Sequence, residues 1–211
     1  MEAQQITTTN IPNKTLERLV IYRRLLSQLC DEGRSNVFSH QLARLAGNTP
    51  AQVRRDLMVI GAHGSPARGY SVRPLLGYVQ DLLGARGVQK IVLVGMGNLG
   101  RAVLSYFGHQ QSGLEIVSAF DTDEARVGRV IAGVRCLHID QMEDDMRRSG
   151  ATLGVVTVPM QQAQAVTDRL VAAGAKGILN FSSAPLHVPY GVAVDDVDIG
   201  LKLEKLAYFA G

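Results

Sequence analysis

The stretch Lys90-Ile-Val-Leu-Val-Gly-Met-Gly-Asn-Leu-Gly-Arg-Ala-Val-Leu104 decides how the rest of the chain is interpreted. Its four apolar residues from Ile91 to Val94 are typical of a strand that is buried in a parallel sheet. Gly95, Gly97 and Gly100 follow at the spacing G-x-G-x-x-G, and an apolar helical pattern begins behind them. A strand, a glycine turn and a helix start can cradle a pyrophosphate, because the free N–H groups and the dipole of the helix favour negative charge. The stretch therefore predicts a dinucleotide site.

A second apolar run strengthens this prediction, since the glycine spacing also occurs at purely structural turns. The run from Glu115 to Phe120 ends in Asp121, twenty-one positions after Gly100. An acid about 20 residues beyond the glycines is the usual ligand of the adenosine ribose hydroxyls. We therefore expect Asp121 to bind the ribose of the dinucleotide.

Composition and charge narrow the class of protein. The chain of 211 residues is 46% hydrophobic and 19% charged, which excludes wholesale disorder and suits one or two domains. Up to Gly77, ten Lys or Arg residues stand against five acids, whereas twelve basic residues meet fourteen acidic ones after it. The basic excess therefore lies in the N-terminal third, which favours a module that binds a polyanion.

Targeting and metal signals are missing from the sequence. No apolar run approaches the roughly 18 residues of a membrane span, and no basic region followed by an apolar core opens the chain. Cys30 and Cys136 lack the spacing of a metal or redox motif, and we expect no metal site. We expect a cytoplasmic protein without a membrane partner, whose cysteines are buried thiols; a redox-sensing role for them is the alternative.

Helical patterns fill the basic third. A first helix begins after Asn13, with one apolar face made by Leu16, Leu19, Val20, Leu25, Leu26 and Leu29. A second helix is expected to start with Ser39 as its N-cap and to stop at Gly47; its inward residues are Leu42, Leu45 and Ala46. A third starts with Thr49 as N-cap and Pro50 as first helical residue. Two short helices joined by a glycine turn form a helix-turn-helix.

The third helix and the segment behind it suit DNA. Val53, Leu57 and Ile60 mark its buried side, so its other long side chains can reach base edges or phosphates in a major groove. The glycine-rich segment 61–72 reads as a hairpin wing with Arg68 near its tip, and a solvated surface loop is the alternative. We predict these residues for binding double-stranded DNA: Thr49, Pro50, Gln52, Arg54, Arg55 and Arg68.

The remaining two thirds alternate between strand and helix patterns. After a bridging helix at about 78–83 we expect strands at 91–94, 115–120, 134–136, 151–158 and 177–180, with helices at 141–148 and 161–173. This alternation predicts a Rossmann-type parallel sheet covered on both faces. Because ligands bind beyond the carboxyl ends of such strands, two further strand ends are candidates for the nicotinamide half. Their residues are Thr157, Val158, Pro159, Asn180 and Phe181.

Neither of these strand ends contains a His, Lys or Tyr that could transfer a proton beside a nicotinamide. We therefore expect no catalytic residues and favour a cofactor that is sensed and not turned over. A small NAD-dependent dehydrogenase with an accessory N-terminal domain is the alternative. A CoA-binding protein, in which the same loop holds a CoA phosphate, is a third interpretation.

The C-terminal segment from Asp195 to Phe209 reads as an acidic helix start followed by an apolar helix, with Leu203, Leu206 and Phe209 on one side. Such a helix needs a partner, which is either its own domain or a second subunit that exchanges the helix. We expect an α/β protein with a winged helix-turn-helix domain at 1–78, a Rossmann-type domain at 79–195 and a dimerisation helix at 196–211.

Taken together, the chain resembles the Rex family of redox-sensing transcriptional repressors over essentially its whole length. The matching segments are Ile11-Pro12, Arg18-Leu19, Tyr22-Arg-Arg24, Ala51-Gln-Val-Arg-Arg-Asp-Leu57, Arg68-Gly-Tyr70, Val94-Gly-Met-Gly-Asn-Leu-Gly100, Phe120-Asp121, Val158-Pro159, Asn180-Phe181 and Val197-Asp198. The segment Val59-Ile-Gly-Ala-His-Gly64 departs from the family, where many relatives carry aromatic residues, so the detail of operator recognition is open.

The resemblance implies a homodimer that binds a palindromic operator, binds NADH or NAD+, exchanges its C-terminal helices, and leaves DNA when NADH binds. It implies that the phosphate loop comprises Gly95, Gly97, Asn98, Leu99 and Gly100, with Asp121 on the adenosine ribose. It also implies a switch in which Arg24 exchanges between Tyr106 and Asp198 of the partner subunit, as a charge-assisted latch.

Overall fold

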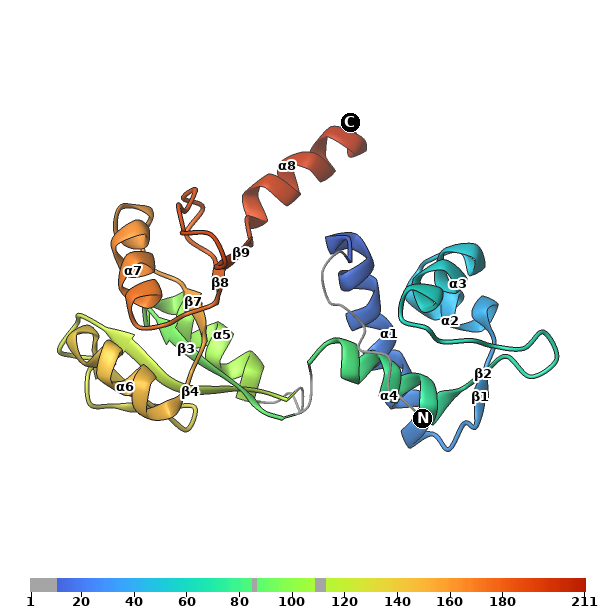
Figure 1. The fold of residues 1–211 in the computed structure, drawn as a ribbon. Helices are drawn as coiled ribbons and strands as arrows, with labels where there is room; N and C mark the ends of the chain where they lie inside the picture. The colour runs from blue at the N-terminus through green and yellow to red at the C-terminus, as the bar shows by residue number, and fades with distance from the viewer. Residues whose placement is uncertain (1–10, 85–86, 109–112) are drawn as a thin grey trace. The chain divides into compact units, whose positions relative to one another are not determined.

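The computed structural model describes residues 11–84, 87–108 and 113–211. The chain divides into two compact units, residues 1–86 and 87–211 (Figure 1). We describe each unit by itself. Within the described ranges no helix is both long and apolar enough to cross a membrane.

The first unit is a small helical domain with a two-stranded sheet. Its elements are α1 (Asn13–Asp31), β1 (Asn36–Val37), α2 (Ser39–Ala46), α3 (Pro50–Val59), β2 (Tyr70–Ser71) and α4 (Val72–Leu82). The strands β1 and β2 pair antiparallel. Helices α2 and α3 meet at Gly47, whose φ of 65° provides the left-handed stop that the sequence predicts. The helix-turn-helix is confirmed.

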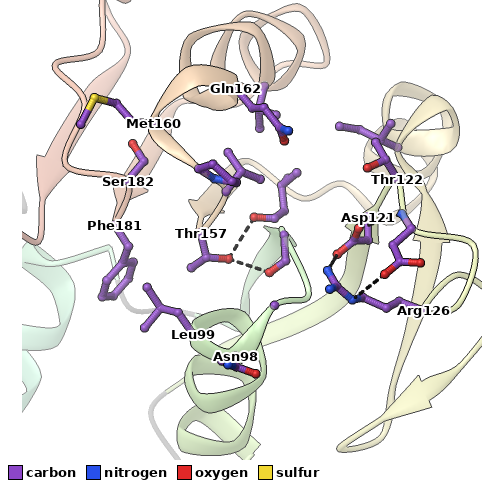
Figure 2. Close-up of a pocket in the computed structure, with 18 residues that line it drawn as sticks. Asn98, Leu99, Asp121, Thr122, Arg126, Thr157, Met160, Gln162, Phe181 and Ser182 are labelled. Carbon is purple, nitrogen blue, oxygen red and sulfur yellow. Dashed lines mark hydrogen bonds and ion pairs between the residues drawn. The ribbon is translucent and has the colours of Figure 1, made fainter.

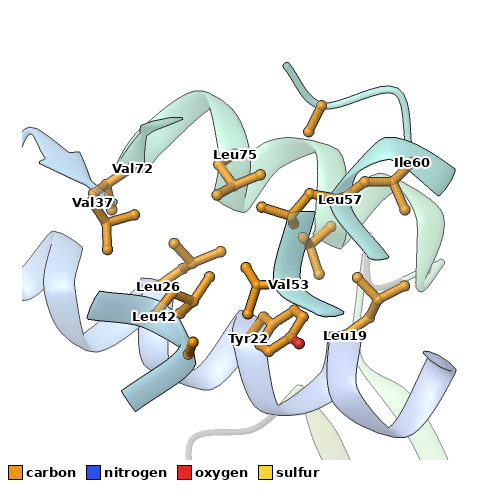
Figure 3. Close-up of a cluster of buried hydrophobic side chains, with 13 residues drawn as sticks. Leu19, Tyr22, Leu26, Val37, Leu42, Val53, Leu57, Ile60, Val72 and Leu75 are labelled. Atoms are coloured by element: carbon orange, nitrogen blue, oxygen red, sulfur yellow. The ribbon is translucent and has the colours of Figure 1, made fainter. Parts of the chain in front are cut away.

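One apolar core joins all four helices (Figure 3). Leu19 and Leu26 of α1 pack there with Leu42, Val53 and Leu57, which are all fully buried. The predicted inner face of α3 is confirmed, because Ile60 is buried as well. Two expectations were wrong: Leu16 is 40% exposed and Leu45 is 53% exposed. Their neighbours Thr15 of α1 and Ala43 of α2 are buried instead.

The helices α2 and α3 are capped in different ways at their starts. Thr49 caps α3 as predicted, since its hydroxyl accepts from the Gln52 N–H at 3.2 Å, and Pro50 follows as the first helical residue. The prediction that Ser39 caps α2 was wrong. The cap is Phe38, because the Gln41 side chain turns back and accepts from the Phe38 N–H at 2.9 Å.

The bridging helix that we expected at 78–83 is α4, and it begins at Val72. Pro74 lies in its first turn, where a missing N–H costs nothing, so it does not end the helix. Val72, Leu75 and Val79 pack into the first core. For this reason the first unit extends to residue 86, whereas the sequence placed the domain boundary after Tyr78.

The second unit is built on one seven-stranded sheet. Its strands are β3 (Gln89–Val94), β4 (Leu114–Asp121), β5 (Val130–Ile131), β6 (Val134–His138), β7 (Leu153–Val156), β8 (Gly177–Asn180) and β9 (Ala193–Asp196). They lie in the order β5-β6-β4-β3-β7-β8-β9, and each pair is parallel except β5 with β6. The order reverses at β3, where a doubly wound sheet has its ligand crevice.

Helices cover both faces of this sheet, as the sequence predicts. They are α5 (Asn98–Gly108), α6 (Met142–Ser149) and α7 (Met160–Ala172), with a 3-10 turn at Ile139–Gln141. Met142 and Met146 of α6 share one core with Val166 and Leu170 of α7. Val103 and Leu104 of α5 pack in a second core, together with the fully buried Cys136. Cys30, by contrast, is only partly buried.

Two predicted element boundaries differ in the structure, and two strands were not predicted. The strand expected at 151–158 is β7, with only four residues, because Thr157 and Pro159 already belong to the loop into α7. Strand β5 has only two residues, and two of the four residues of β9 are aspartates, so neither shows a strand pattern in the sequence. Asp195 and Asp196 lie in β9, so the acidic first turn expected for the last helix was wrong.

The last helix, α8 (Ile199–Ala210), buries none of its residues. Asp198 caps it, and the Asp198 carboxylate accepts from the Leu201 N–H at 2.9 Å. Its apolar side chains are exposed: Ile199, Leu201, Leu203, Leu206, Tyr208 and Phe209. An exposed apolar surface of this size needs a partner in solution.

Candidate functional site

A pocket of about 580 Å3 lies at the carboxyl ends of β3, β4 and β7 (Figure 2). Its size falls in the range of small-ligand and cofactor sites. The structure brings together nearly all of the predicted cofactor residues there: Gly95, Gly97, Asn98, Leu99, Asp121, Thr157, Val158, Pro159 and Phe181. They come from four separate segments of the chain, so the sheet topology assembles the pocket.

The glycine loop is shaped by close backbone packing. Gly95 has a φ of 102°, and a side chain on it would approach Thr157 and Val158 to 2.9 Å. Gly100 does not line the pocket itself, but a Cβ there would lie 1.9 Å from the Gly95 carbonyl oxygen. Nothing lies within 4 Å of a Cβ built on Gly97, which faces the pocket. The loop is therefore tight on its protein side and open where a pyrophosphate would bind.

Thr157 supports this loop from the neighbouring strand. Its hydroxyl lies 2.8 Å from the Gly95 carbonyl oxygen and 3.0 Å from that of Val94, as the dashed lines in Figure 2 show. Its N–H also donates to Val94 at 2.9 Å. These bonds satisfy the carbonyl groups at the end of β3 and leave the N–H groups at the start of α5 for an anion.

Asp121 ends β4 and is almost completely buried. One carboxylate oxygen accepts from the Met96 N–H at 2.7 Å and from Arg126 Nη1 at 2.9 Å; the other accepts from the Asp123 N–H at 2.9 Å. Burial alone would raise the pKa of Asp121, but the bonds from Asp123, Arg126 and Met96 outweigh it and lower that pKa. The group is a carboxylate at neutral pH and can accept from a ribose hydroxyl.

Sequence reasoning missed several residues of the pocket. Thr122, Asp123 and Arg126 follow Asp121 on the loop after β4, while Gln162 and Ser182 lie at the start of α7 and after β8. The sequence did contain a signal for the loop after β4, because the polar run Thr-Asp-Glu-Ala-Arg directly follows Asp121. Only the fold shows that this loop turns back, so that Arg126 meets Asp121 (Figure 2).

Asn180 is the one predicted strand-end residue that lies outside this pocket. It is 1% exposed and lines a smaller hollow beside Asp196 and Asp198. Its amide nitrogen donates to Asp196 and to the Ala184 carbonyl, and its oxygen accepts from Ser182. The Asn180 side chain thus holds the loop that presents Phe181 and Ser182 to the main pocket.

The far side of the pocket is apolar. Val158, Pro159, Met160 and Phe181 line it, and none of the described lining residues is a His, Lys or Tyr. Phe181 and Leu99 lie on the same side of Figure 2, across from Asp121. A flat heteroaromatic ring fits such a wall, whereas an acid or base for hydride transfer is not part of it.

The first unit offers a basic surface on α3 and the wing. Arg54 and Arg55 are exposed, and Arg54 donates to the Ser39 hydroxyl at 3.2 Å. The wing narrows at a bridge between Ser65 and Gly69, with Arg68 at its tip. Gln52, which we expected to point outward, donates instead to the Asp56 carboxylate at 2.8 Å.

Asp56 fastens α3 to α1 beneath this surface. It is 1% exposed and accepts from Arg18 Nε at 2.6 Å, from Arg18 Nη2 at 2.8 Å and from the Tyr22 hydroxyl at 3.0 Å. Burial raises the pKa of Asp56, but the bonds from Arg18, Gln52 and Tyr22 outweigh this and lower it. Burial, together with the Asp56 charge, raises the pKa of Tyr22. The bidentate pair sets the position of α3 on α1.

The three switch residues lie on separate elements. Arg24 is exposed on α1, Tyr106 is 57% exposed on α5, and the partly exposed Asp198 caps α8 through one carboxylate oxygen. All three are therefore accessible to partners.

Comparison with known proteins identifies both units separately. A family model described as a putative DNA-binding protein N-terminus matches residues 10–57. A model described as a CoA binding domain matches residues 88–184, which include the pocket.

Curated relatives match nearly the whole chain. The redox-sensing transcriptional repressor Rex of Geobacillus kaustophilus is 40% identical over 199 residues, which cover 94% of this chain and 93% of the relative. Rex of Carboxydothermus hydrogenoformans is also 40% identical, over 94% of this chain and 95% of its own length.

Solved structures agree. The Rex-family repressor RSP in complex with NAD+ and operator DNA is 30% identical, covers 96% of this chain and 93% of its own, and has a TM-score of 0.88. RSP in complex with NADH is 29% identical, with a TM-score of 0.82 over 96% of this chain and 95% of its own. The curated relatives are named as repressors and not as dehydrogenases. With a DNA-binding unit, a nucleotide pocket and these full-length matches, the chain belongs to the Rex family of redox-sensing transcriptional repressors.

Proposed function

We propose that this protein is a cytoplasmic repressor that binds a palindromic operator as a homodimer and leaves it when NADH replaces NAD+. The observation that carries the proposal is the pocket at the ends of β3, β4 and β7, in a chain that also contains a winged helix-turn-helix. The solved relative RSP has been crystallised with NADH and, separately, with NAD+ and operator DNA. The lack of a His, Lys or Tyr among the described lining residues favours sensing over turnover.

In this proposal the cofactor lies across the loop from 95 to 100. The N–H groups at the start of α5 bind the pyrophosphate, Asp121 accepts from the adenosine ribose, and the apolar side with Val158 and Phe181 takes the nicotinamide ring. Asn180 acts through the loop that it holds. NADH is uncharged at its nicotinamide ring whereas NAD+ is cationic there, so an apolar wall favours the reduced form.

The DNA-binding residues are those at the start of α3 and on the wing. Thr49 and Pro50 begin the helix, Arg54 and Arg55 are exposed along it, and Arg68 extends from the wing toward phosphate or a minor groove. Gln52 reaches a base edge only by exchanging its bond to Asp56 for one to DNA.

The exposed α8 supports the dimer. An apolar helix that buries nothing in its own chain is suited to pack on a second subunit by exchange. In such an exchange Asp198 enters the partner together with the helix, which gives Arg24 a carboxylate to bind in one state and Tyr106 in the other. Two-fold symmetry of the dimer explains a palindromic operator.

Operator binding should fall as the ratio of NADH to NAD+ rises. The measurement is a mobility shift of the full-length protein on a palindromic duplex at fixed total cofactor and fixed salt, because phosphate contacts make affinity depend strongly on salt. NADH is expected to weaken the complex at least about tenfold relative to NAD+, which corresponds to about 1.4 kcal/mol of coupling. Equal effects of the two cofactors refute redox sensing, and failure to bind any such duplex at low salt refutes the repressor.

The same titration separates the other interpretations. A CoA-binding protein would respond to CoA. In our proposal, however, the Asp121 carboxylate binds the adenosine ribose, and CoA carries a phosphate on that ribose. The carboxylate would repel this phosphate. A dehydrogenase would oxidise an alcohol or hydroxy acid with NAD+. We expect no response to CoA and no turnover.

Arg24→Ala should uncouple the two units: NADH still binds, but it no longer releases DNA, because the arginine that discriminates between the two states is missing. Isothermal titration with NADH and the mobility shift with NADH measure the two halves of this prediction. Arg23→Ala is the control, since it removes the same charge from the neighbouring position of α1. If Arg24→Ala responds to NADH like the parent protein, the latch is refuted.

A further inference from the structure

The adenosine end of the pocket contains an arginine to which we have so far given no function. Arg126 lies on the loop after β4, and its side chain is 41% exposed. Its guanidinium donates through Nη1 to Asp121 at 2.9 Å, and its Nε lies 3.1 Å from the Asp123 carboxylate. Two carboxylates therefore hold the guanidinium in place at the edge of the pocket (Figure 2).

The third nitrogen of this group is unused. Among the residues that the structure describes, Nη2 of Arg126 has no hydrogen-bond partner, whereas Nη1 donates to Asp121 and Nε is ion-paired with Asp123. Arg126 lines the pocket next to Asp121, the ribose residue in our proposed function. A fixed guanidinium with one free N–H2 group is a ready donor to an anionic oxygen, because its orientation costs no further entropy.

The carboxylate beside it is also nearly saturated. Asp121 already accepts three hydrogen bonds, from Met96, Asp123 and Arg126, out of about four that a carboxylate can accept. One position is left for a ribose hydroxyl. A substituent on the other ribose oxygen would therefore lie near the Arg126 guanidinium and near Asp121 and Asp123, which flank it.

We infer that Arg126 is the specificity-determining residue for the 2′ position of the adenosine ribose, where it offsets the repulsion of a 2′-phosphate by Asp121 and Asp123. A 2′-phosphate carries between one and two negative charges at neutral pH. Two carboxylates reject it, and an arginine bound between them reduces that rejection. Arg126 thus sets how strongly the pocket prefers NADH over NADPH. This inference rests on the proposed function, since it assumes that the pocket binds a pyridine dinucleotide.

Arg126→Ala tests the inference through a ratio of affinities. NADH and NADPH are titrated into the full-length protein and their binding is followed by the fluorescence of the reduced nicotinamide. We expect the ratio of the NADPH to the NADH dissociation constant to rise about tenfold in Arg126→Ala. Only NADPH carries the 2′-phosphate, and the substitution removes the positive charge that lies near this phosphate. Arg126→Lys keeps the charge and should keep the ratio within about threefold of the parent value.

Arg129→Ala is the matched control, because Arg129 is an exposed arginine three residues further on the same loop and does not line the pocket. Its ratio should equal that of the parent protein. An equal loss of NADH and NADPH affinity in Arg126→Ala would show a merely structural role for Arg126 and overturn the inference, as would an unchanged ratio. In both cases the proposed function survives, because NADH still binds to the parent protein. Failure of the parent protein to bind either cofactor would instead overturn the proposed function and this inference with it.

Discussion

Gly100→Ala is expected to abolish the response to NADH while leaving DNA binding intact. The added Cβ would lie 1.9 Å from the Gly95 carbonyl oxygen and 3.0 Å from the Thr157 hydroxyl. No side-chain rotation relieves a clash with backbone, so the start of α5 must move away from the loop. We expect the NADH dissociation constant to rise at least about hundredfold, because the N–H groups that face the pyrophosphate lose their alignment.

Gly97→Ala separates misfolding from lost contact. A Cβ on Gly97 meets nothing within 4 Å, and the residue faces the pocket, so the variant should keep its thermal stability and still lose NADH affinity. Isothermal titration gives the affinities, and operator binding without cofactor shows that the first unit is folded. A Gly100→Ala protein that binds NADH like the parent protein would contradict the loop geometry. Undiminished NADH binding by Gly97→Ala would show that the pyrophosphate lies elsewhere.

Asp56→Ala is expected to destabilise the first unit by about 3 kcal/mol or more, because removal of one partner leaves a largely buried charge without compensation. The substitution removes a bidentate partner of Arg18, which is only 20% exposed, and leaves the buried Tyr22 hydroxyl without its carboxylate. Helix α3 loses its fixed position on α1, so operator affinity should fall as well. Urea unfolding combined with hydrogen exchange of residues 11–84 locates the loss in the first unit.

The dependence on pH gives a second test of this cluster. The Asp56 pKa is lower in the folded protein than its ordinary value. Its contribution to stability is therefore complete above about pH 4 and is lost as the pH falls through the folded pKa. Asp56→Asn should lose this part of the acid sensitivity, whereas Glu17→Ala, which removes an exposed acid from α1, should retain it. Equal stability of Asp56→Ala and Glu17→Ala at neutral pH would contradict the role of the cluster.

Several features followed from the sequence because they depend on neighbouring residues. The strand from Ile91 to Val94, the stop at Gly47 and the cap at Thr49 are decided by local periodicity and backbone preference. The offset from Gly100 to Asp121 also has a local reason, because one helix and one strand fill a nearly constant length of chain. Their order along the chain was enough to identify the family.

Other features depend on which segments the fold brings together. Leu16 and Leu45 have apolar side chains, but they lie on the exposed sides of α1 and α2, whereas their neighbours Thr15 and Ala43 are buried. Gln52 reads as an outward polar residue of α3, and only the buried Asp56 explains why it turns back. The short strands β5 and β9 exist because the neighbouring strand edges supply their hydrogen bonds.

The loop from Gly95 to Gly100 shows which features depend on the local sequence and which depend on the tertiary structure. The sequence by itself determined that a strand, a glycine turn and a helix follow one another here, because each glycine meets a local need of the backbone. Only the tertiary structure decided what surrounds the loop: Thr157 under its carbonyl groups, Asn180 turned away to hold the next loop, and Arg126 bound between two acids at the ribose end. The contacts of Thr157 and Asn180 join residues that are distant in the chain. Arg126 is only five residues from Asp121, but the loop must turn back for the two to meet, and the packing of the sheet determines that geometry.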